Sequence, residues 1–509
     1  MTERKKFFYN ATLLTIVALT IRTVNLAFSA FISRKIGAEA LGLYTLIGTI
    51  YAFAVTFATS GINLTVTRLV ASAVGEGKNG EIQRIMKHSF LYALIFSGFA
   101  SIVLFSFSPY FATVVLKDAR AEAPLKALAL SLIPIAMSSV FSGYFIGVKK
   151  IVRSSFVQVA SQIFRISITV ILIIKASERG VAEATLALCV ATTLGELSSF
   201  LFAFFQYVTA KKPHPYEKSE SEFSHVTSVA LPLAFSAYIR SALLTLEHVL
   251  IPRRLKLFGN SDSEALSSYG TLHGMALPVT LYPMTLLSSF SSLLVPEFAE
   301  CEAAKNFKRL KRICEEVIGA SLRFAAPVAV FIYVFSEEIA YTVYSSYEAG
   351  SYIAMLAPVI PIMYLDHVTD AMLKGVGEQV YSMWVNISDS LLSVFLIWFL
   401  LPKMGIAGYA WVIIIMEAYN FILSFSRLKY RVKFSAKALL SFILPFFEAT
   451  LAALFSKELF AFSGSLTTPP WLIAKIVFSV CIFVALNVFE RMIFRNRATR
   501  VTKKALAFR

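Results

Sequence analysis

Charged residues are scarce in this sequence of 509 residues. Asp, Glu, Lys and Arg make up only 16% of the chain, whereas 57% of its residues are hydrophobic. Soluble globular proteins contain about 25% charged and about 45–50% apolar residues. A chain with so little polar surface cannot cover itself in water, so an ordinary soluble domain is excluded and lipid is the expected solvent.

Cysteines and catalytic motifs are also few. The four cysteines show neither metal-ligand spacing nor the pattern of a disulfide framework. The sequence contains no G-x-x-x-x-G-K-[ST] phosphate-binding loop and no H-E-x-x-H zinc motif. No polar segment is long enough for a catalytic domain. We therefore expect neither an enzyme nor a bound metal or cofactor, apart from Na⁺ or H⁺ as a coupling ion.

Long apolar runs fill the space between the charged positions. The segment from Ala11 to Ile32 contains one charge, and the segment from Trp471 to Phe489 contains only Lys475. As a helix, each run can cross a hydrocarbon core of roughly 30 Å. The pattern predicts an all-α, polytopic membrane protein with about 14 transmembrane helices. We expect them near residues 10–33, 41–73, 88–115, 125–148, 154–175, 182–209, 226–252, 267–298, 314–336, 350–373, 379–401, 405–426, 436–456 and 471–490.

Positive charge is concentrated in the loops on one side of these spans. With a cytoplasmic amino terminus, about 30 Lys and Arg fall on the cytoplasmic side and roughly 12 on the other side. This bias predicts an even number of spans in the cytoplasmic membrane, with both termini in the cytoplasm. It also accounts for the net charge of +17 without nucleic acid, because the basic residues do not form one face of a folded domain.

One long polar segment, residues 211–223, has the Pro, Ser and charge content of a linker and divides the chain. The sequence repeats on either side of it. Residues 45–48 (TLIG) resemble residues 271–274 (TLHG), and the Gly-Val pair at 147–148 resembles that at 375–376. The nearly constant offset of about 225–228 residues indicates a duplication.

This duplication predicts the domain organisation. Six spans in each half preserve the topology, so parallel repeats related by an axis along the membrane normal are expected. We predict two pseudo-symmetric six-helix lobes, residues 1–210 and 224–433, joined by the cytoplasmic linker and followed by two extra C-terminal helices and a basic tail, residues 434–509. Two like lobes around a central cavity are typical of an alternating-access carrier.

Polar residues within the spans are the candidates for binding, because a charge at mid-bilayer costs at least about 2.5–3.5 kcal/mol. Arg22 lies near the middle of the first span, with Asn25 one turn away on the same face. Arg240 and Glu247 share a face of the seventh span. We predict that these four residues bind substrate, with Arg22 as a ligand of phosphate or carboxylate. The structural alternatives are pairing of Arg22 with an acidic residue of another span and pairing of Arg240 with Glu247.

Carboxylates within the spans could bind a coupling proton or Na⁺. Asp366, Asp370 and Lys374 follow i, i+4, i+8 spacing, so this face of the tenth span could partly neutralise itself. The candidates for ion coupling are Glu196, Asp366, Asp370, Asp389 and Glu417.

The eighth span is interrupted by helix-breaking residues. It contains Gly274, Pro278, Pro283 and Pro296, and each proline removes a backbone hydrogen bond. Interrupted helices persist in membranes where they line cavities or bend during transport. We therefore expect these four residues to permit gating.

The interrupted span also carries a family resemblance. Residues 268–300, SYGTLHGMALPVTLYPMTLLSSFSSLLVPEFAE, resemble the stage V sporulation protein B branch of the multidrug/oligosaccharidyl-lipid/polysaccharide (MOP) exporter superfamily. Arg22 followed by residues 34–37 resembles the first helix of that family, and Gly-Glu at 195–196 its sixth. The segment SQIFR, residues 161–165, resembles its fifth helix but lacks the usual glutamate.

This resemblance implies a fourteen-helix, two-lobe carrier related to lipid II flippases. The implied cargo is an undecaprenyl-pyrophosphate-linked glycan for cell-envelope or spore-wall synthesis. By analogy Arg22 contacts the pyrophosphate, and the last two helices form a groove for the lipid tail. The expected partners are this lipid-linked glycan and membrane lipids.

Two other functions remain open. A cation-coupled multidrug exporter of the same superfamily would need an anionic cavity, and the arginines within the spans argue against it. A non-transporting membrane scaffold would instead recruit envelope-synthesis enzymes as partners. Flipping of labelled lipid II in vesicles would separate these functions.

Overall fold

The structure, a computed structural model, describes residues 3–59, 61–75, 80–148, 150–210, 223–461 and 470–488. Side-chain surroundings are described from residue 20 onward, with some gaps within helices. All regular secondary structure in the described part is helical. Contacts between Cα atoms divide the chain into two compact units. Unit 1 comprises Met1–Gly274 and Asn386–Val412, and unit 2 comprises Met275–Val385 and Ile413–Arg509.

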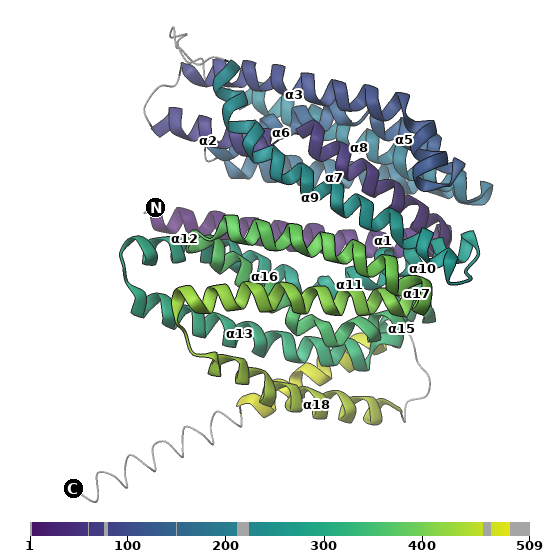
Figure 1. The fold of residues 1–509 in the computed structure, drawn as a ribbon, viewed down its shortest axis with the longest axis vertical. Helices are drawn as coiled ribbons and strands as arrows, with labels where there is room; N and C mark the ends of the chain where they lie inside the picture. Colours follow the sequence, from purple (N-terminus) through teal and green to yellow (C-terminus); the bar gives the residue numbers. More distant parts are fainter. Residues whose placement is uncertain are drawn as a thin grey trace, which may run out of the picture. The chain divides into compact units, whose positions relative to one another are not determined.

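Unit 1 is built from the helices of the first half of the chain and the first two elements of the second half (Figure 1). They are α1 (Glu3–Thr59), α2 (Ile62–Gly75), α3 (Glu81–Ser106), α4 (Ser108–Tyr110), the π-helical η1 (Phe111–Leu116), the 3₁₀ turn η2 (Ala119–Ala121), α5 (Glu122–Ala129), α6 (Leu132–Gly147), α7 (Ile151–Ala176), the 3₁₀ turn η3 (Ser177–Arg179), α8 (Val181–Ala210), α9 (Phe223–Leu257) and α10 (Asp262–Thr271). The part of α17 (Gln379–Val432) from Asn386 to Val412 also belongs to this unit.

Two helices are far longer than one membrane crossing. The 57 residues of α1 and the 54 residues of α17 would each extend about 80 Å as a straight helix, against a hydrocarbon core of roughly 30 Å. Both are broken at a glycine. Gly37 has φ 78° and ψ 172°, and Gly405 has φ 59° and ψ −142°, a region that L-residues with side chains rarely adopt. Each glycine therefore divides its helix into two segments of membrane-spanning length.

Small residues allow close packing within unit 1. Helix α1 packs on α10, and α7 packs on α8. Where α1 meets α10, a Cβ atom added to Gly270 would lie 2.3 Å from the carbonyl oxygen of Ala38 and 2.6 Å from the amide nitrogen of Gly42. Only glycine fits at this contact, as is common where membrane helices approach closely.

Unit 2 contains the remaining elements. They are α11 (Leu277–Leu281), α12 (Met284–Ala303), α13 (Phe307–Val334), α14 (Ser336–Tyr344), α15 (Tyr347–Leu356), the 3₁₀ turn η5 (Ala357–Val359), α16 (Ile360–Gly375), the two ends of α17 outside Asn386–Val412, the 3₁₀ segment η6 (Ala436–Phe442), α18 (Ile443–Ala461) and a last helix, Pro470–Val488. The π-helical η4 (Leu272–Ala276) contains the point where unit 1 ends and unit 2 begins. Within unit 2, α13 packs against α16 and α18.

The duplication predicted from sequence is visible in the helices themselves. Helix α16 begins and ends 228 positions after α6, and α17 begins 228 positions after α7. Val148 and Val376, which follow α6 and α16, have nearly the same φ and ψ, and each amide bonds back to the fourth residue before it. Lys117 and Ser345, also 228 positions apart, are both left-handed. The grouping of these helices into six-helix lobes stays a prediction.

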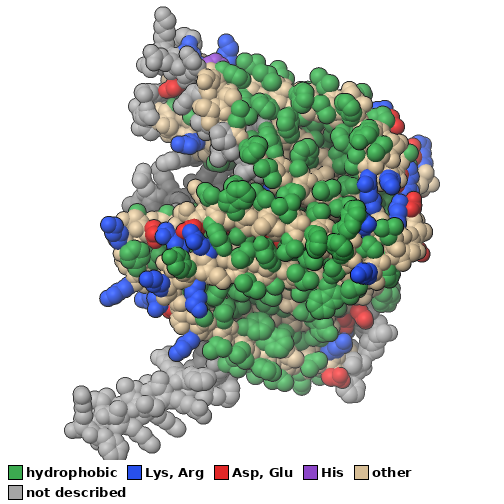
Figure 2. Space-filling view, in the orientation of Figure 1, with side chains coloured by type: hydrophobic (Ala, Val, Ile, Leu, Met, Phe, Trp, Pro, Cys, Tyr) green, Lys and Arg blue, Asp and Glu red, His purple; other side chains and the backbone are tan. Residues whose placement is uncertain are grey.

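The helices have the length and composition of membrane spans. In the described residues, nine helices are long and apolar enough to cross a membrane, or ten if the pair that includes α5 and α6, bent by 42°, counts as one span. Figure 2 shows hydrophobic side chains over much of the visible face. Ile102 and Phe205 on unit 1 are 68% and 67% exposed, as lipid-facing residues would be. The prediction of an all-α polytopic membrane protein is confirmed.

Candidate functional site

Hydrogen bonds between α1 and α7 join three polar side chains of unit 1. Gln162 donates from Nε2 to Oδ1 of Asn25 at 2.5 Å, and Arg165 donates from Nη2 to Oε1 of Gln162 at 2.5 Å. Arg22 is half-buried and lies one turn before Asn25 on α1. We call Arg22, Asn25, Gln162 and Arg165 the arginine network. Asn25, which was predicted on the first span, is thus linked through Gln162 to a second arginine, from the segment SQIFR.

Helix α8 completes the surroundings of this network. Gly195 leaves room for Arg165, because a Cβ atom there would lie 2.8 Å from its Cγ. Glu196, the next residue, is half-buried, and Arg165 is among the charges that act on it. The network therefore contains two guanidinium groups, one on α1 and one on α7. Guanidinium groups bind phosphate and carboxylate oxygens through paired hydrogen bonds, so these two arginines are suited to an anion.

The other two predicted substrate residues do not pair with each other. Arg240 on α9 is exposed, and it forms no ion pair with any residue that the structure describes. Glu247, two turns later, is half-buried and interacts with Tyr409 at 3.5 Å, with Ser393 and with the charge of Asp389, all on α17. We call Glu247, Asp389, Ser393 and Tyr409 the Glu247 group. It contains two carboxylates, so it suits a cation rather than an anionic substrate.

Two histidines adjoin the Glu247 group. His248 Nδ1 lies 3.0 Å from the hydroxyl of Tyr269, and its ring centroid is 4.7 Å from that of His273. The ring of His273 in turn lies 5.5 Å from that of Tyr409, and its buried Nε2 has no hydrogen-bond partner in the described part of the chain. Sequence reasoning overlooked Tyr269 and His273, although both lie on the segment that carries the family resemblance.

The tenth-span carboxylates lie in unit 2. Lys374 Nζ lies 2.6 Å from Oδ2 of Asp370, and Ser382 also donates to this carboxylate. This face is therefore partly neutralised, as its spacing suggested. Asp366 is half-buried one turn earlier, and Glu417 is half-buried on α17. The roles of these carboxylates stay predictions.

A polar cavity lies among α2, α6, α7 and α8 of unit 1. It has a volume of about 190 Å³. Sequence reasoning missed it, because single serines within apolar helices give no distinct signal. Its polar lining residues are Asn63, Ser138, Ser139, Ser142, Ser154, Gln158 and Ser199. Hydroxyl and amide groups at this density suit water or another hydroxylated group.

The interruption predicted for the eighth span is present. The helix is π-helical over η4, Pro278 lies in the first turn of α11, and Pro283 precedes α12. The carbonyl of Gly274 accepts a 3.0 Å hydrogen bond from Ser29 Oγ, and the chain passes from unit 1 to unit 2 directly after this residue. Pro296 is within α12, but its side chain is outside the described residues. Gating at these positions stays a prediction.

Two family models match this chain. The model described as polysaccharide biosynthesis protein matches residues 7–302, and the MatE model matches residues 256–399. Stage V sporulation protein B of Bacillus subtilis (strain 168) is 26% identical over 420 residues, which are 81% of this chain and 81% of that protein. Sporulation protein YkvU of the same organism is 20% identical over 383 residues, 73% of this chain and 83% of that protein.

Solved structures show the same fold. Lipid II flippase MurJ, in an inward closed conformation, superposes with a TM-score of 0.69 at 14% identity, covering 97% of this chain and 99% of that one. An inward-facing multidrug resistance MATE family transporter of the MOP superfamily gives a TM-score of 0.66 at 18% identity, covering 82% and 98%. The resemblance expected from residues 268–300 is confirmed at the level of the superfamily.

Proposed function

Because the chain belongs to the polysaccharide biosynthesis protein family, we propose that it flips an undecaprenyl-pyrophosphate-linked glycan, such as lipid II, across the cytoplasmic membrane. It is a membrane transporter of the MOP superfamily. Likeness to a structure named as a lipid II flippase supports a lipid-linked cargo. Relatives named for sporulation support a role in spore-wall or envelope synthesis.

The arginine network is the observation that carries this proposal. A pyrophosphate within a membrane is stable only beside cationic groups, because an unpaired charge is costly in a low dielectric. Arg22 and Arg165 supply two guanidinium groups on adjoining helices, with Gln162 holding Arg165 in place. We assign pyrophosphate binding to Arg22 and Arg165, with Asn25 as a neutral ligand.

The proposed carrier has fourteen spans. Division of α1 and α17 at Gly37 and Gly405 turns the nine membrane-length helices of the described residues into eleven. The bent pair with α5 and α6, the helix α9, and the interrupted series α10 to α12 supply three more. An even number of spans places both termini on the same side of the membrane. The positive charge of the loops on that side supports a cytoplasmic location for both termini.

We assign ion coupling to the Glu247 group. Glu196 and Asp370 each have a cation beside them, Arg165 and Lys374 respectively, which reduces their ability to attract another. Glu247 instead adjoins Asp389, and two carboxylates together favour binding of H⁺ or Na⁺. We therefore assign Glu247 to ion coupling, whereas the sequence had suggested substrate binding. Bending at Pro278 and Pro283 would allow the interrupted eighth span to gate transport.

Reconstituted transport tests the proposal. Fluorescent lipid II would be flipped in proteoliposomes by the wild type, and Arg22→Ala should lower the rate about tenfold or more, the effect of losing a charge-assisted hydrogen bond to the cargo. Arg22→Lys should retain part of the rate. The matched control is Arg179→Ala, because Arg179 is exposed on η3 outside the network. Wild-type flipping by Arg22→Ala would refute the assignment.

Cation-coupled multidrug export is the second candidate, and the MatE match over residues 256–399 supports it. A cationic drug would be repelled by the arginine network but attracted by the Glu247 group. Efflux of ethidium from the same proteoliposomes separates the two functions. Efflux that is lost in Glu247→Gln but unchanged in Arg22→Ala, without flipping of lipid II, would favour the drug exporter.

A further inference from the structure

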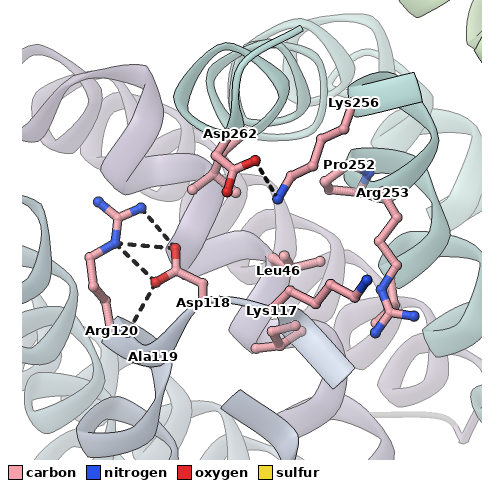
Figure 3. Close-up of a pocket in the computed structure, with 12 residues that line it drawn as sticks. Leu46, Lys117, Asp118, Ala119, Arg120, Pro252, Arg253, Lys256 and Asp262 are labelled. Carbon is pink, nitrogen blue, oxygen red and sulfur yellow. Dashed lines mark hydrogen bonds and ion pairs between the residues drawn. The ribbon is translucent and has the colours of Figure 1, made fainter. Parts of the chain in front are cut away.

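A small basic cavity lies in unit 1 where α9 ends (Figure 3). It has a volume of about 280 Å³ and is lined by the segment after η1, the last turns of α9, the start of α10 and part of α1. This volume is just below the range of roughly 300–1,000 Å³ that is typical of sites for drug-sized ligands. The charged lining residues are Lys117, Asp118, Arg120, Arg253, Lys256 and Asp262. None of them belongs to the arginine network or to the Glu247 group.

Two of the four cations in this cavity are already paired. Arg120 binds both carboxylate oxygens of Asp118, with its Nη2 at 2.7 Å from Oδ2, and it also contacts Glu39 at 2.9 Å. Lys256 Nζ lies 2.7 Å from Oδ1 of Asp262. These two pairs set the walls of the cavity without leaving a free positive charge.

Lys117 and Arg253 are the cations that remain, since neither has a carboxylate partner among the described residues. The side chains of Lys117 and Arg253 extend toward each other across the cavity in Figure 3. Arg253 Nη2 donates to the carbonyl of Val114 at 2.7 Å and to that of Val115, so two carbonyls at the end of η1 fix the guanidinium. Its Nε is buried and has no hydrogen-bond partner in the described structure.

We propose that this cavity binds a phosphate or diphosphate group between Lys117 and Arg253. Two converging cations repel each other, and an anion between them converts that repulsion into attraction. The fixed guanidinium can donate its free N–H to one oxygen, and the ammonium of Lys117 can reach another as a point charge. In the fourteen-span topology proposed above, this end of unit 1 faces the outside of the cell. The phosphate would then come from an outer-leaflet lipid headgroup, including that of a flipped cargo, or from a soluble diphosphate.

Protection of Lys117 from acylation tests the site directly. The purified full chain in dodecyl maltoside, which contains no phosphate, is treated with a water-soluble N-hydroxysuccinimide ester, and acylation of each lysine is quantified by mass spectrometry. One arm adds inorganic pyrophosphate, and the other adds phosphatidylglycerol. Acylation of Lys117 should fall at least about fivefold in one or both arms. Lys126, which is paired with Glu122 outside the cavity, is the internal control and should change little.

Variants separate this site from the arginine network. Arg253→Gln removes the fixed charge and should abolish protection of Lys117, whereas Arg253→Lys should keep part of it. In Arg22→Gln, Lys117 should be protected as in the wild type, even if this variant no longer flips lipid II. Failure of the transport proposal and failure of the cavity proposal are therefore distinguishable. Protection by pyrophosphate alone would identify a soluble diphosphate, and protection by phosphatidylglycerol a lipid headgroup. Equal acylation of Lys117 with and without both ligands would overturn the proposal, as would full protection in Arg253→Gln.

Discussion

The side-chain amide of Gln162 on α7 donates a 2.5 Å hydrogen bond to Oδ1 of Asn25 on α1, 137 residues earlier in the chain. The oxygen of the same amide accepts from Arg165 at 2.5 Å. One uncharged side chain therefore links the helix that carries Arg22 to the second arginine of the network. Gln162 can orient Arg165 for an anion without neutralising it.

Two substitutions of Gln162 should show whether this residue acts by orienting Arg165 or by leaving the charge of Arg165 unpaired by a carboxylate. Gln162→Glu places a carboxylate beside Arg165, which would pair with it and withdraw it from a pyrophosphate, so KM for lipid II flipping should rise about tenfold or more. Gln162→Leu removes the hydrogen bonds without adding charge and should have a smaller effect. Flipping assays in proteoliposomes measure both, with thermal unfolding as a control for folding. If the two variants lose the same amount of activity, the charge of Arg165 does not act on the cargo.

The close contact between α1 and α10 should contribute to the thermal stability of the protein. Gly270→Ala would place its Cβ 2.3 Å from a backbone oxygen that cannot move independently of α1, so the helices must separate. Overpacking of this kind costs about 1–3 kcal/mol or more, and the melting temperature of the purified protein should fall by several degrees. Gly48→Ala is the matched control, because a Cβ atom at Gly48 on α1 meets nothing within 4 Å. Similar melting temperatures for the two variants would contradict the close approach.

Local sequence patterns were sufficient to predict much of this fold. Apolar runs located the helices, glycines and prolines located the breaks, and the Gly-Val repeat revealed a duplication that recurs in the bounds of α6 and α16. Each of these signals lies within a few residues or depends on a fixed period. Arg22 and Asn25 were chosen as candidates for the same reason, since polar residues stand out in an apolar helix, and their role in binding stays a prediction.

Partners on other helices could not be predicted in this way. Gln162 lies 137 residues from Asn25, and Tyr409 lies 162 residues from Glu247. The spacing along one helix shows which residues share a face, but not which other helix covers that face. The grouping of Glu247 with Asp389, rather than with Arg240 on its own helix, depends on that packing. The basic cavity around Lys117 and Arg253 was missed because its residues come from four separate segments.

An ion-pair cluster at the start of α17 should stabilise unit 2. Glu378 is 13% exposed and accepts from Arg427 at 2.9 and 3.0 Å and from Arg431 at 3.0 Å. Glu378→Gln would leave both arginines without this charge, and a loss of about 2 kcal/mol in the free energy of unfolding is expected from charge-assisted hydrogen bonds. Thermal or denaturant unfolding in detergent measures the change.

The control for this cluster is an exposed ion pair on α13. Arg312 and Glu316 are 79% and 62% exposed and lie four residues apart. Water and salt screen such a pair, so Glu316→Gln should leave the unfolding midpoint unchanged. A shift in Glu316→Gln as large as that in Glu378→Gln would show that burial does not set the strength of these pairs.

Glu247→Gln should uncouple transport from its driving ion. A carboxamide cannot exchange a proton at neutral pH and is a weaker ligand for Na⁺ than a carboxylate, so the stimulation of flipping by an ion gradient should disappear while flipping without a gradient remains. Two gradients are compared in proteoliposomes, one of Na⁺ at constant pH and one of pH without Na⁺.

Glu458→Gln on α18 is the matched control, because Glu458 is exposed and its substitution should leave the response unchanged. Asp389→Asn should weaken the response as well, since Asp389 supplies the second charge that favours a bound cation. A full gradient response in Glu247→Gln would exclude the Glu247 group and leave Asp366 and Glu417 as the carboxylates to test.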